Sequence, residues 1–225
     1  MISRFEIDHE TRDKCYKCYR PFSSCMCSYV NKIDTKTKFV ILMHPREFKK
    51  TKNGTGHFTH LSLENSHIYI GIDFSNNKDI NSIINNSNYN CFILYPDENA
   101  IKLNHQNIQQ YNKTNVIFII DSTWACSKKM LRVSKNLHNI PRVSFEHTKS
   151  SAFKIKTQPN SYCLSTIEST LCILELLNYH NIEKIKENKL DKFLDPFNKM
   201  VEYQMSCAIG AGDESVRYKK PYKRI

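Results

Sequence analysis

The sequence predicts an α/β domain built around a mainly parallel sheet, because short segments rich in β-branched and aromatic residues alternate with helical patterns. The expected strands are Lys38–Met43, His67–Ile72, Cys91–Tyr95, Val116–Ile120 and Arg142–Phe145. The expected helices are Trp124–Leu137, Ile167–Tyr179 and much of Ile182–Met205. In such sheets ligands bind where loops leave the carboxyl ends of strands, so the residues directly after each strand are candidates for a site.

Chain length and composition fit one medium-sized domain. The chain has 225 residues, of which 40% are hydrophobic. A folded chain of this size removes roughly 70% of its unfolded surface from water, so its core needs no disulfides. The longest apolar runs, such as Phe39–Met43, are far shorter than the roughly 20 residues of a membrane span. The first ten residues mix both charge signs and lack a secretory pattern, which predicts a cytoplasmic protein.

The charge balance is strongly basic. Lys and Arg number 33 against 22 Asp and Glu, which gives a formal net charge of +11. A polyanionic partner is expected, and nucleic acid comes first because neutralising its phosphates releases counterions. A basic surface that only keeps the protein soluble is the alternative. The last residues, 213–225, form a basic tail that could also contact phosphate.

A cluster of cysteines lies near the N-terminus. Four of the nine cysteines are Cys15, Cys18, Cys25 and Cys27, while the others are scattered through apolar segments. Four thiolates held in a tight loop favour a tetrahedral zinc ion. A redox CxxC motif would follow a strand, and no strand precedes this one. We therefore expect an N-terminal zinc-type module over residues 1–36, a main domain over 37–212 and the basic tail.

Several common catalytic motifs are absent. The chain has five glycines, and neither G-x-G pair is followed by the third glycine of a dinucleotide fingerprint. No G-K-S/T, G-x-S-x-G or H-E-x-x-H pattern occurs. The sequence therefore excludes the P-loop, the Rossmann fingerprint, the α/β-hydrolase elbow and the zincin motif.

A carboxylate follows the most apolar strand. Asp121-Ser122-Thr123-Trp124 comes directly after Val116–Ile120, ahead of a helix whose basic residues share one face. Two interpretations stay open: Asp121 caps the helix and Trp124 is core, or both belong to a functional site. Ser165-x-x-Glu168 matches a capping box ahead of another apolar helix. The Asn-rich stretches Asn76–Asn90 and Asn104–Asn115 are interpreted as polar loops.

Seven ordered blocks resemble one known family. They are Arg12-x2-Cys15-x2-Cys18-x-Arg20-Pro21-x3-Cys25-x-Cys27, His44-Pro45-x-Glu47, Thr55-Gly56, Leu94-Tyr95-Pro96, Asp121-Ser122-Thr123-Trp124 with Lys129-Met130, Pro141-Arg142 and Ser165-Thr166-Ile167-Glu168. Together they resemble the DTW-domain proteins, the tRNA-uridine aminocarboxypropyltransferases. Ser122 and Ser169 depart from the glycine and alanine that the family often has there, and neither change removes a charged or nucleophilic group.

The resemblance implies a SPOUT-like fold, with helices on both faces of the sheet and a knotted C-terminal region that binds S-adenosylmethionine. It also implies that the ring imino nitrogen of a tRNA uridine attacks the γ-carbon of the methionine moiety. The products would be 3-amino-3-carboxypropyl-uridine and methylthioadenosine. The imino group must lose a proton, and a positioned, partly buried carboxylate can accept it, so Asp121 is the candidate base.

The other expected site residues fall into three sets. Cofactor contacts are expected from Leu94, Tyr95, Pro96, Thr123, Trp124, Ser165, Thr166, Glu168, Thr55 and Gly56. RNA contacts are expected from His44, Arg46, Lys128, Lys129, Arg132, Lys135 and Arg142. The metal ligands are expected to be Cys15, Cys18, Cys25 and Cys27.

Two alternatives remain at this point. A SPOUT-type RNA methyltransferase would release S-adenosylhomocysteine instead of methylthioadenosine. A zinc-containing RNA-binding protein without catalytic activity would use Asp121 only as a helix cap.

Overall fold

The structure is a computed structural model that describes residues 13–49, 54–109, 112–148, 150–153 and 163–210. Arg12 of the first motif and the basic tail lie outside the described residues. The predicted parallel sheet is confirmed: six strands pair in the order β2-β1-β5-β3-β6-β4, and every pairing between them is parallel. The strands are β1 (Lys38–Met43), β2 (Ser66–Ile70), β3 (Tyr89–Leu94), β4 (Ile101–Lys102), β5 (Thr114–Asp121) and β6 (Arg142–Ser144).

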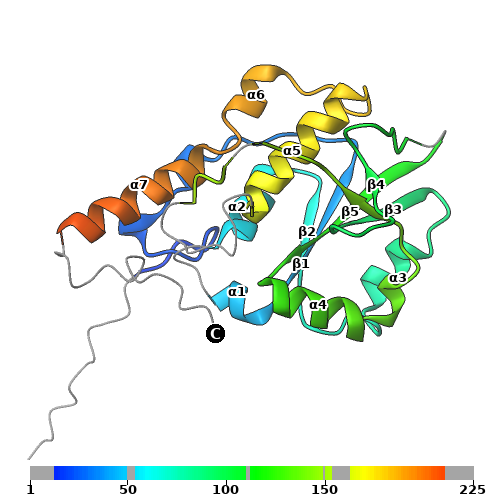
Figure 1. Cartoon of the computed structure of the whole chain (residues 1–225). Coiled ribbons are helices and arrows are strands. Elements are labelled where there is room, and N and C mark those ends of the chain that lie inside the picture. The colour runs from blue at the N-terminus through cyan, green and yellow to red at the C-terminus, as the bar shows by residue number, and fades with distance from the viewer. Residues whose placement is uncertain (1–12, 50–53, 110–111, 149, 154–162, 211–225) are drawn as a thin grey trace, which may run out of the picture.

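Helices cover both faces of this sheet (Figure 1). The α-helices are α1 (Pro45–Lys49), α2 (Thr55–Ser62), α3 (Lys78–Ile84), α4 (Trp124–Val133), α5 (Thr166–Tyr179), α6 (Glu187–Asp191) and α7 (Asp195–Gly210). The 3₁₀ helices are η1 (Phe22–Ser24), η2 (Cys27–Tyr29) and η3 (Lys135–Leu137). Helices α2 and α5 lie over one face with the start of α7, whereas α3 and α4 cover the other.

The alternation of side chains along β5 divides the core into two clusters. Ile117 and Ile119 pack with the residues of α2, α5 and α7. Val116 and Phe118 pack with the residues of α3 and α4. Because successive side chains of a strand point to opposite faces, Asp121 continues the row that faces α2 and α5. The last residue of the central strand is therefore directed toward these two helices.

Two expected helices are each interrupted. The segment expected as Trp124–Leu137 divides into α4 and η3 at Ser134, which is fully buried. The Ser134 hydroxyl accepts the backbone N–H of Phe74 at 3.1 Å, so it ties α4 to the loop after β2. The segment Ile182–Met205 likewise contains two helices, α6 and α7. Strand β4, which has only two residues, was not predicted because so short a strand leaves no alternating pattern.

The prediction of a polar loop over Asn76–Asn90 was wrong. This stretch contains α3, and the Asn77 side chain caps the helix by accepting the N–H of Ile80 at 3.0 Å. Ile80 is fully buried between α3 and the sheet, which stabilises a helix of low intrinsic propensity. Asparagine therefore acts here as a cap and not as a sign of irregular structure.

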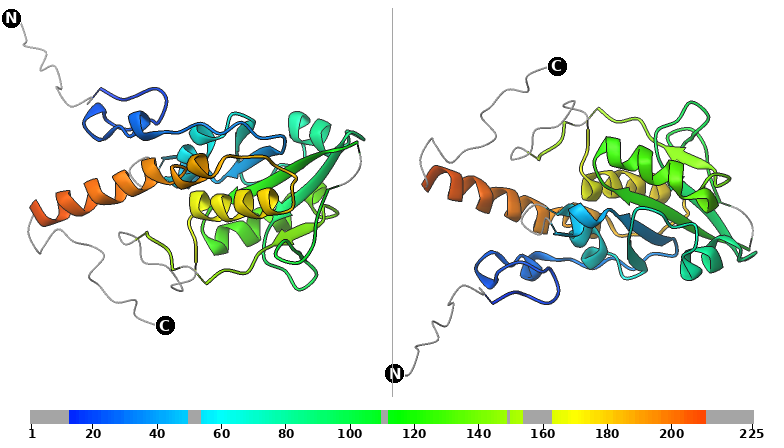
Figure 2. Two further views of the ribbon diagram at one scale, coloured as in Figure 1. Left: turned by 90° about the horizontal axis from the view of Figure 1, so that it is seen from above. Right: turned by 90° about the horizontal axis from the view of Figure 1, so that it is seen from below.

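The cysteine-rich segment packs alongside α7 and against α1 and α2 (Figure 2). The guanidinium of Arg20, which is 2% exposed, lies 3.9 Å from the centre of the Phe58 ring on α2. The Tyr19 ring meets the rings of Phe48 and His57 at 5.6 and 5.3 Å. These contacts attach the segment firmly to the main domain. Among the described residues, no helix has both the length and the apolar character of a membrane span.

Replacing Phe118 by Ala will lower the free energy of unfolding by about 3–5 kcal/mol, because the ring is fully buried in the middle of β5 and its removal leaves a cavity. Urea unfolding followed by far-UV circular dichroism measures this change. Ile70→Ala, on edge strand β2 where the side chain is about half exposed, serves as the control. An equal loss in both variants would contradict the assignment of Phe118 to the core.

Candidate active site

A cavity of about 330 Å³ opens at the carboxyl ends of β3, β5 and β6. Its size is within the range of small-molecule sites, which is roughly 300–1,000 Å³. It is lined by Leu94, Tyr95, Pro96, Ile119, Ile120, Ser122, Trp124, Ser127, Ser144, Phe145, His147, Cys163, Leu164, Thr166 and Ser169. This is the edge of the sheet where the sequence predicted a ligand site.

Asp121 lies next to this cavity, behind its wall. It is the last residue of β5 and is 6% exposed. The hydroxyl of Thr166, which does line the cavity, donates to Asp121 Oδ1 at 2.6 Å. The carboxylate is therefore joined to the cavity through a single hydroxyl group at the start of α5.

The start of α2 is packed tightly against the same carboxylate. A Cβ atom added to Gly56 would lie 2.7 Å from Asp121 Cγ and 2.8 Å from Met43 Cε. Only glycine, which has no Cβ, allows the backbone of α2 to come so close to the end of β5. The predicted neighbour Thr55 is buried beside Gly56 at the first turn of α2. Neither residue lines the cavity, so both act on it from behind Asp121.

His44 supports Asp121 from the neighbouring strand. It follows β1, is buried, and its backbone N–H donates to the Asp121 carbonyl oxygen at 3.0 Å. Its Nδ1 accepts the backbone N–H of Arg46 at 3.0 Å, which fixes the first turn of α1. Arg46 itself is exposed on α1.

The predicted capping box at the start of α5 is confirmed, and it also holds a distant segment. Glu168 is 6% exposed, and its carboxylate accepts the backbone N–H of Ser165 at 2.8 Å. The same carboxylate accepts the Ser151 hydroxyl at 2.8 Å and the Ala152 N–H at 2.7 Å. Its oxygens are thus engaged by the chain itself. Glu168 fixes α5, and with it Thr166, relative to the segment at residues 151–152.

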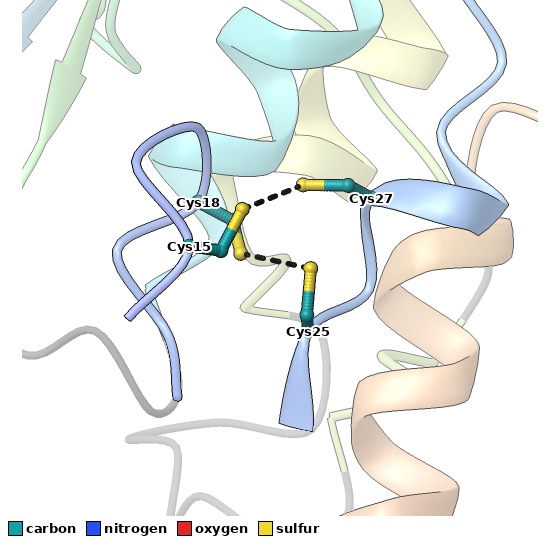
Figure 3. A group of neighbouring side chains, drawn as sticks. All are labelled: Cys15, Cys18, Cys25 and Cys27. Carbon is teal, nitrogen blue, oxygen red and sulfur yellow. Dashed lines mark hydrogen bonds between the residues drawn. The ribbon is translucent and has the colours of Figure 1, made fainter. Parts of the chain in front are cut away.

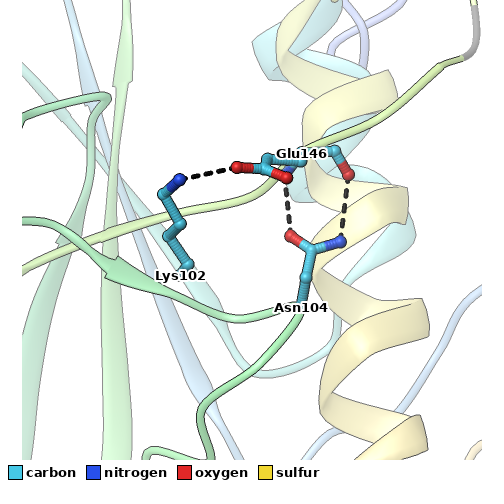
Figure 4. A network of polar contacts seen from close by, with 3 residues as sticks. All are labelled: Lys102, Asn104 and Glu146. Carbon is cyan, nitrogen blue, oxygen red and sulfur yellow. Dashed lines mark hydrogen bonds and ion pairs between the residues drawn. The ribbon is translucent and has the colours of Figure 1, made fainter.

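Another polar pair fixes the wall that carries Phe145 and His147 (Figure 4). The Asn104 side chain accepts the Glu146 N–H at 2.7 Å and donates to the Glu146 carbonyl oxygen at 3.0 Å. It thereby continues the β4–β6 pairing by one step beyond Ser144. Lys102 adds an exposed ion pair to the Glu146 carboxylate at 2.6 Å. Asn104, in a stretch that was expected as a polar loop, therefore supplies a specific structural contact from that loop.

Aromatic and basic side chains connect this cavity with a second, more open hollow. The Tyr95 ring lies 6.0 Å from the Trp124 ring in an edge-on arrangement. Arg142, which is paired with Asp97, also lies 5.5 Å from the Tyr95 ring centre. The second hollow, of about 390 Å³, is lined by Tyr95, Lys128, Leu131, Arg132, His138 and Arg142.

The structure brings together many, but not all, of the expected site residues. Five expected cofactor contacts line the cavity: Leu94, Tyr95, Pro96, Trp124 and Thr166. Four lie just outside its lining: Thr55, Gly56, Ser165 and Glu168. Thr123 precedes α4 and is exposed, with its carbonyl oxygen accepting the Ser127 N–H at 2.8 Å. Of the expected RNA contacts, Lys128, Arg132 and Arg142 share the second hollow, whereas Lys129 and Lys135 lie outside it.

Sequence reasoning missed part of the lining, notably Ser127, Phe145, His147 and Cys163. Phe145 and His147 follow β6, so the rule on strand ends could have found them. Cys163 lies just ahead of α5 and no sequence pattern marks it.

The four N-terminal cysteines converge on one point (Figure 3). Their sulfur atoms all lie within 4.8 Å of one another, and all four are free thiols. Cys15 and Cys27 are 3.7 Å apart at sulfur, as are Cys18 and Cys25. A tetrahedral ion with bonds of about 2.3 Å to sulfur would require sulfur separations of about 3.8 Å. The Cys15–Cys27 and Cys18–Cys25 pairs already have this separation and no pair exceeds 4.8 Å, so the four sulfurs could hold a metal ion.

The surroundings shift the pKa values of these thiols in opposite directions. The backbone N–H of Cys18 lowers the pKa of the Cys15 thiol to about 6. Burial raises the pKa of Cys25 and that of Cys27, so in the absence of a cation these two thiols resist ionisation. Arg20 lies beside the sulfurs, and its burial lowers the pKa of its guanidinium while Cys18 opposes that shift. Arg20 can offset the negative charge of a metal bound by four thiolates.

One known protein family matches most of this chain. The model of the DTW domain family matches residues 12–205. This range includes the four clustered cysteines, Asp121 and α5. This chain belongs to the DTW domain family. No solved structure was found to match the DTW chain.

Curated relatives of this DTW chain carry a common name. The chain is 27% identical over 180 residues to "tRNA-uridine aminocarboxypropyltransferase 2" of Mus musculus, covering 78% of the chain and 60% of the relative. It is 30% identical over 173 residues to the protein of the same name from Drosophila melanogaster, covering 74% and 67%. The Macaca fascicularis protein of that name is 27% identical over 175 residues, covering 76% and 58%. The match thus spans about three fifths to two thirds of these relatives' lengths.

Replacing Gly56 by Ala in this DTW protein will destabilise it by about 1–3 kcal/mol, because the added methyl group must displace Asp121 or Met43. Alanine ordinarily stabilises a helix relative to glycine by about 1 kcal/mol, so the sign of the change is diagnostic. Urea unfolding provides the measurement. A gain in stability would contradict the close approach of α2 to Asp121.

Proposed function

We propose that this protein is a tRNA-uridine aminocarboxypropyltransferase. It would transfer the 3-amino-3-carboxypropyl group of S-adenosylmethionine to the ring imino nitrogen, N3, of a tRNA uridine. The products would be acp3U and methylthioadenosine. Membership of the DTW family and the names of the curated relatives support this proposal. The observation that carries it is the contact of Thr166 with Asp121 at the wall of a cavity of cofactor size.

The residues around the cavity fit S-adenosylmethionine. Leu94, Pro96 and Phe145 offer apolar walls for an adenine ring, and the faces of Tyr95 and Trp124 attract a sulfonium cation. The first turn of α5, a helix of 14 residues, supplies backbone N–H groups that favour a carboxylate. When bound there, S-adenosylmethionine supplies an aminocarboxypropyl group that is activated by attachment to the sulfonium. The chain contributes binding and orientation for this group.

Thr166 and Asp121 are suited to remove the imino proton of the target uridine. Asp121 does not line the cavity, but the Thr166 hydroxyl does and already donates to Asp121 Oδ1. We infer that the imino proton passes to the Thr166 oxygen as the hydroxyl proton passes to the Asp121 carboxylate. A base must lie within hydrogen-bond reach of the proton it takes, directly or through one intervening group, and Thr166 would be that intervening group. The His44 N–H holds the backbone of Asp121, and α2 packs at Gly56 against the carboxylate.

The RNA would be held beside the cavity by basic side chains. Lys128, Arg132 and Arg142 line the hollow that shares Tyr95 with the cavity, so they can bind phosphates next to the target base. Lys129, Lys135 and Arg46, which are exposed outside the lining of the hollow, remain proposed contacts, whereas His44 is buried and would reach the RNA only through its exposed neighbour Arg46. Phosphate contacts position the RNA, whereas the uridine is selected by turning its base outward onto aromatic side chains. A cytoplasmic location, together with tRNA as partner, belongs to the same proposal.

Zinc is the metal we propose for Cys15, Cys18, Cys25 and Cys27. A set of four cysteine ligands is typical of structural zinc and leaves no open position for a substrate. The site holds the turn whose Tyr19 and Arg20 pack on α1 and α2. Zinc would therefore support the position of Gly56 and act on the active site only through packing.

Purified protein is expected to contain about one zinc ion per chain, and Cys18→Ser will lower both zinc content and melting temperature. Atomic emission gives the metal content and thermal unfolding gives stability. Cys207→Ser, at an exposed cysteine outside the cluster, should change neither. A full complement of zinc in the Cys18 variant would contradict the proposed ligand set.

Incubation with S-adenosylmethionine and unmodified tRNA is expected to yield methylthioadenosine and aminocarboxypropyl-uridine, both identified by mass spectrometry. S-adenosylhomocysteine with a methylated nucleoside would instead establish a methyltransferase. A tRNA that binds but gains no modification would indicate an RNA-binding protein without this activity.

Asp121→Asn is expected to lower kcat by roughly 100- to 10,000-fold, because amide oxygen is a poor proton acceptor. Binding of S-adenosylmethionine and tRNA, measured by calorimetry and filter binding, should stay near wild type. Thr166→Val should show a similar loss, since it interrupts the same proton path. Asp73→Asn, at an exposed carboxylate, is the control. Full turnover in the Asp121 variant would contradict its role as base.

A further inference from the structure

The metal-binding turn carries an unusual concentration of exposed aromatic side chains. Of the eight large apolar side chains that are exposed among the described residues, four lie between residues 16 and 29: Tyr16, Tyr19, Phe22 and Tyr29. Tyr16 is 90% exposed and Phe22 is 62% exposed. Single exposed apolar residues are common, but a cluster in one short segment marks an interaction surface.

Two of these four rings are already in contact with the main domain. Tyr19 packs on Phe48 and His57, and Tyr29 lies 5.9 Å from the ammonium group of Lys199. Tyr16 and Phe22 make no ring contact with any part of the chain that the structure describes. Their faces are available to a partner.

The backbone of the turn holds Tyr16 and Phe22 on one small hairpin. Lys14 and Pro21 form an antiparallel bridge, and the Phe22 N–H donates to the Asp13 carbonyl oxygen at 3.0 Å. The Cys15 N–H donates to the Arg20 carbonyl oxygen at 2.8 Å, which closes the turn that contains Tyr16. Both rings are thus displayed by a fixed loop, so a partner binds them at little cost in ordering.

The charge of the segment indicates the class of partner. No Asp or Glu occurs between Asp13 and Asp34, whereas Lys14, Lys17, Arg20 and Lys32 fall in that interval. Lys14 and Lys17 are exposed and flank Tyr16 in the sequence. Exposed rings interleaved with cations favour unpaired nucleic acid, because bases stack on the rings while the cations contact phosphates. A protein partner of ordinary charge would leave these cations without matching acids.

We propose that the hairpin at residues 13–22 is a second RNA-binding site, in which Tyr16 and Phe22 stack on unpaired bases and Lys14 and Lys17 bind the adjacent phosphates. It would bind a single-stranded part of the RNA substrate, separate from the nucleotide in the cavity. The choice of RNA as partner rests on the proposed function, but the site itself rests on the exposed rings and the charge.

The test measures RNA affinity of the full-length, zinc-loaded protein without S-adenosylmethionine. Tyr16→Ala/Phe22→Ala is expected to weaken binding of unmodified tRNA and of a short single-stranded RNA about tenfold or more, and of blunt duplex RNA very little. Its salt dependence should match that of wild type because no charge is lost. The Lys14→Ala/Lys17→Ala variant should instead show a weaker dependence of RNA affinity on salt concentration, because two phosphate contacts are lost. Tyr16→Phe, which keeps the ring, should retain affinity.

Controls separate this role from a structural one. Zinc content and melting temperature of each variant are measured in parallel, and Tyr179→Ala tests an exposed aromatic residue outside the hairpin. Cross-linking of 4-thiouridine-labelled tRNA to the wild-type protein gives an independent readout, expected at the peptide that holds Tyr16 and Phe22. Unchanged affinity, an equal loss for duplex RNA, or an oligomeric state that depends on these rings would overturn the proposal.

Failure of the hairpin proposal and failure of the proposed transfer reaction give different results. Dependence of tRNA binding on Tyr16 and Phe22 without any aminocarboxypropyl transfer would support the hairpin site and reject the proposed reaction. Transfer with an unchanged KM for tRNA in the double variant would reject the hairpin site alone.

Discussion

The burial of the Asp121 carboxylate at the end of the central strand constrains the structure around it. A buried carboxylate must be held by hydrogen bonds, because desolvation without them is costly. Thr166 supplies a bond from the start of α5, and α2 approaches so closely that only glycine fits at position 56. Two helices on one face of the sheet are thus fixed by one side chain. The cavity takes its position from the same contacts.

The walls of the cavity are held by polar groups that do not face it. Glu168 joins α5 to residues 151–152, and Asn104 extends the edge of the sheet to Glu146. Both use a side chain to satisfy backbone groups of a loop, which would otherwise be free to move. Rigid support of this kind matters for group transfer, because small displacements of reacting groups lower rates sharply.

The cysteine cluster acts at a distance on the same site. Its turn presents Tyr19 and Arg20 inward, to Phe48 and Phe58 on the helices next to Asp121. It presents Tyr16 and Phe22 outward to solvent. The proposed zinc ion, bound by all four sulfurs, would leave the turn little conformational freedom and so fix the positions of both sets of side chains. One small module thereby packs against the candidate active site on one side and carries the proposed RNA-binding rings on the other.

The sequence by itself determined the parallel sheet, five of its strands, the capped start of α5 and the set of four cysteines. These features depend on local patterns: apolar runs, the S-x-x-E spacing and paired cysteines. Strand-end residues such as Tyr95 and Trp124 could also be predicted as part of the site. Helix α3 could not, because Asn77 as a cap and asparagine as a loop residue look the same without the burial of Ile80.

Only the tertiary structure decided the partners of these residues. Thr166 was expected to contact the cofactor, and its bond to Asp121 appears only when β5 and α5, 45 residues apart, are brought together. Gly56 was also expected to contact the cofactor, whereas its need to lack a Cβ arises from Asp121 and Met43 and appears only in the folded chain. Glu168 matched a local capping box, but the hydrogen bond that it accepts from Ser151 joins residues far apart in the sequence. Local sequence encodes which groups are present, whereas long-range packing sets the distances between them, and the proposed chemistry depends on those distances.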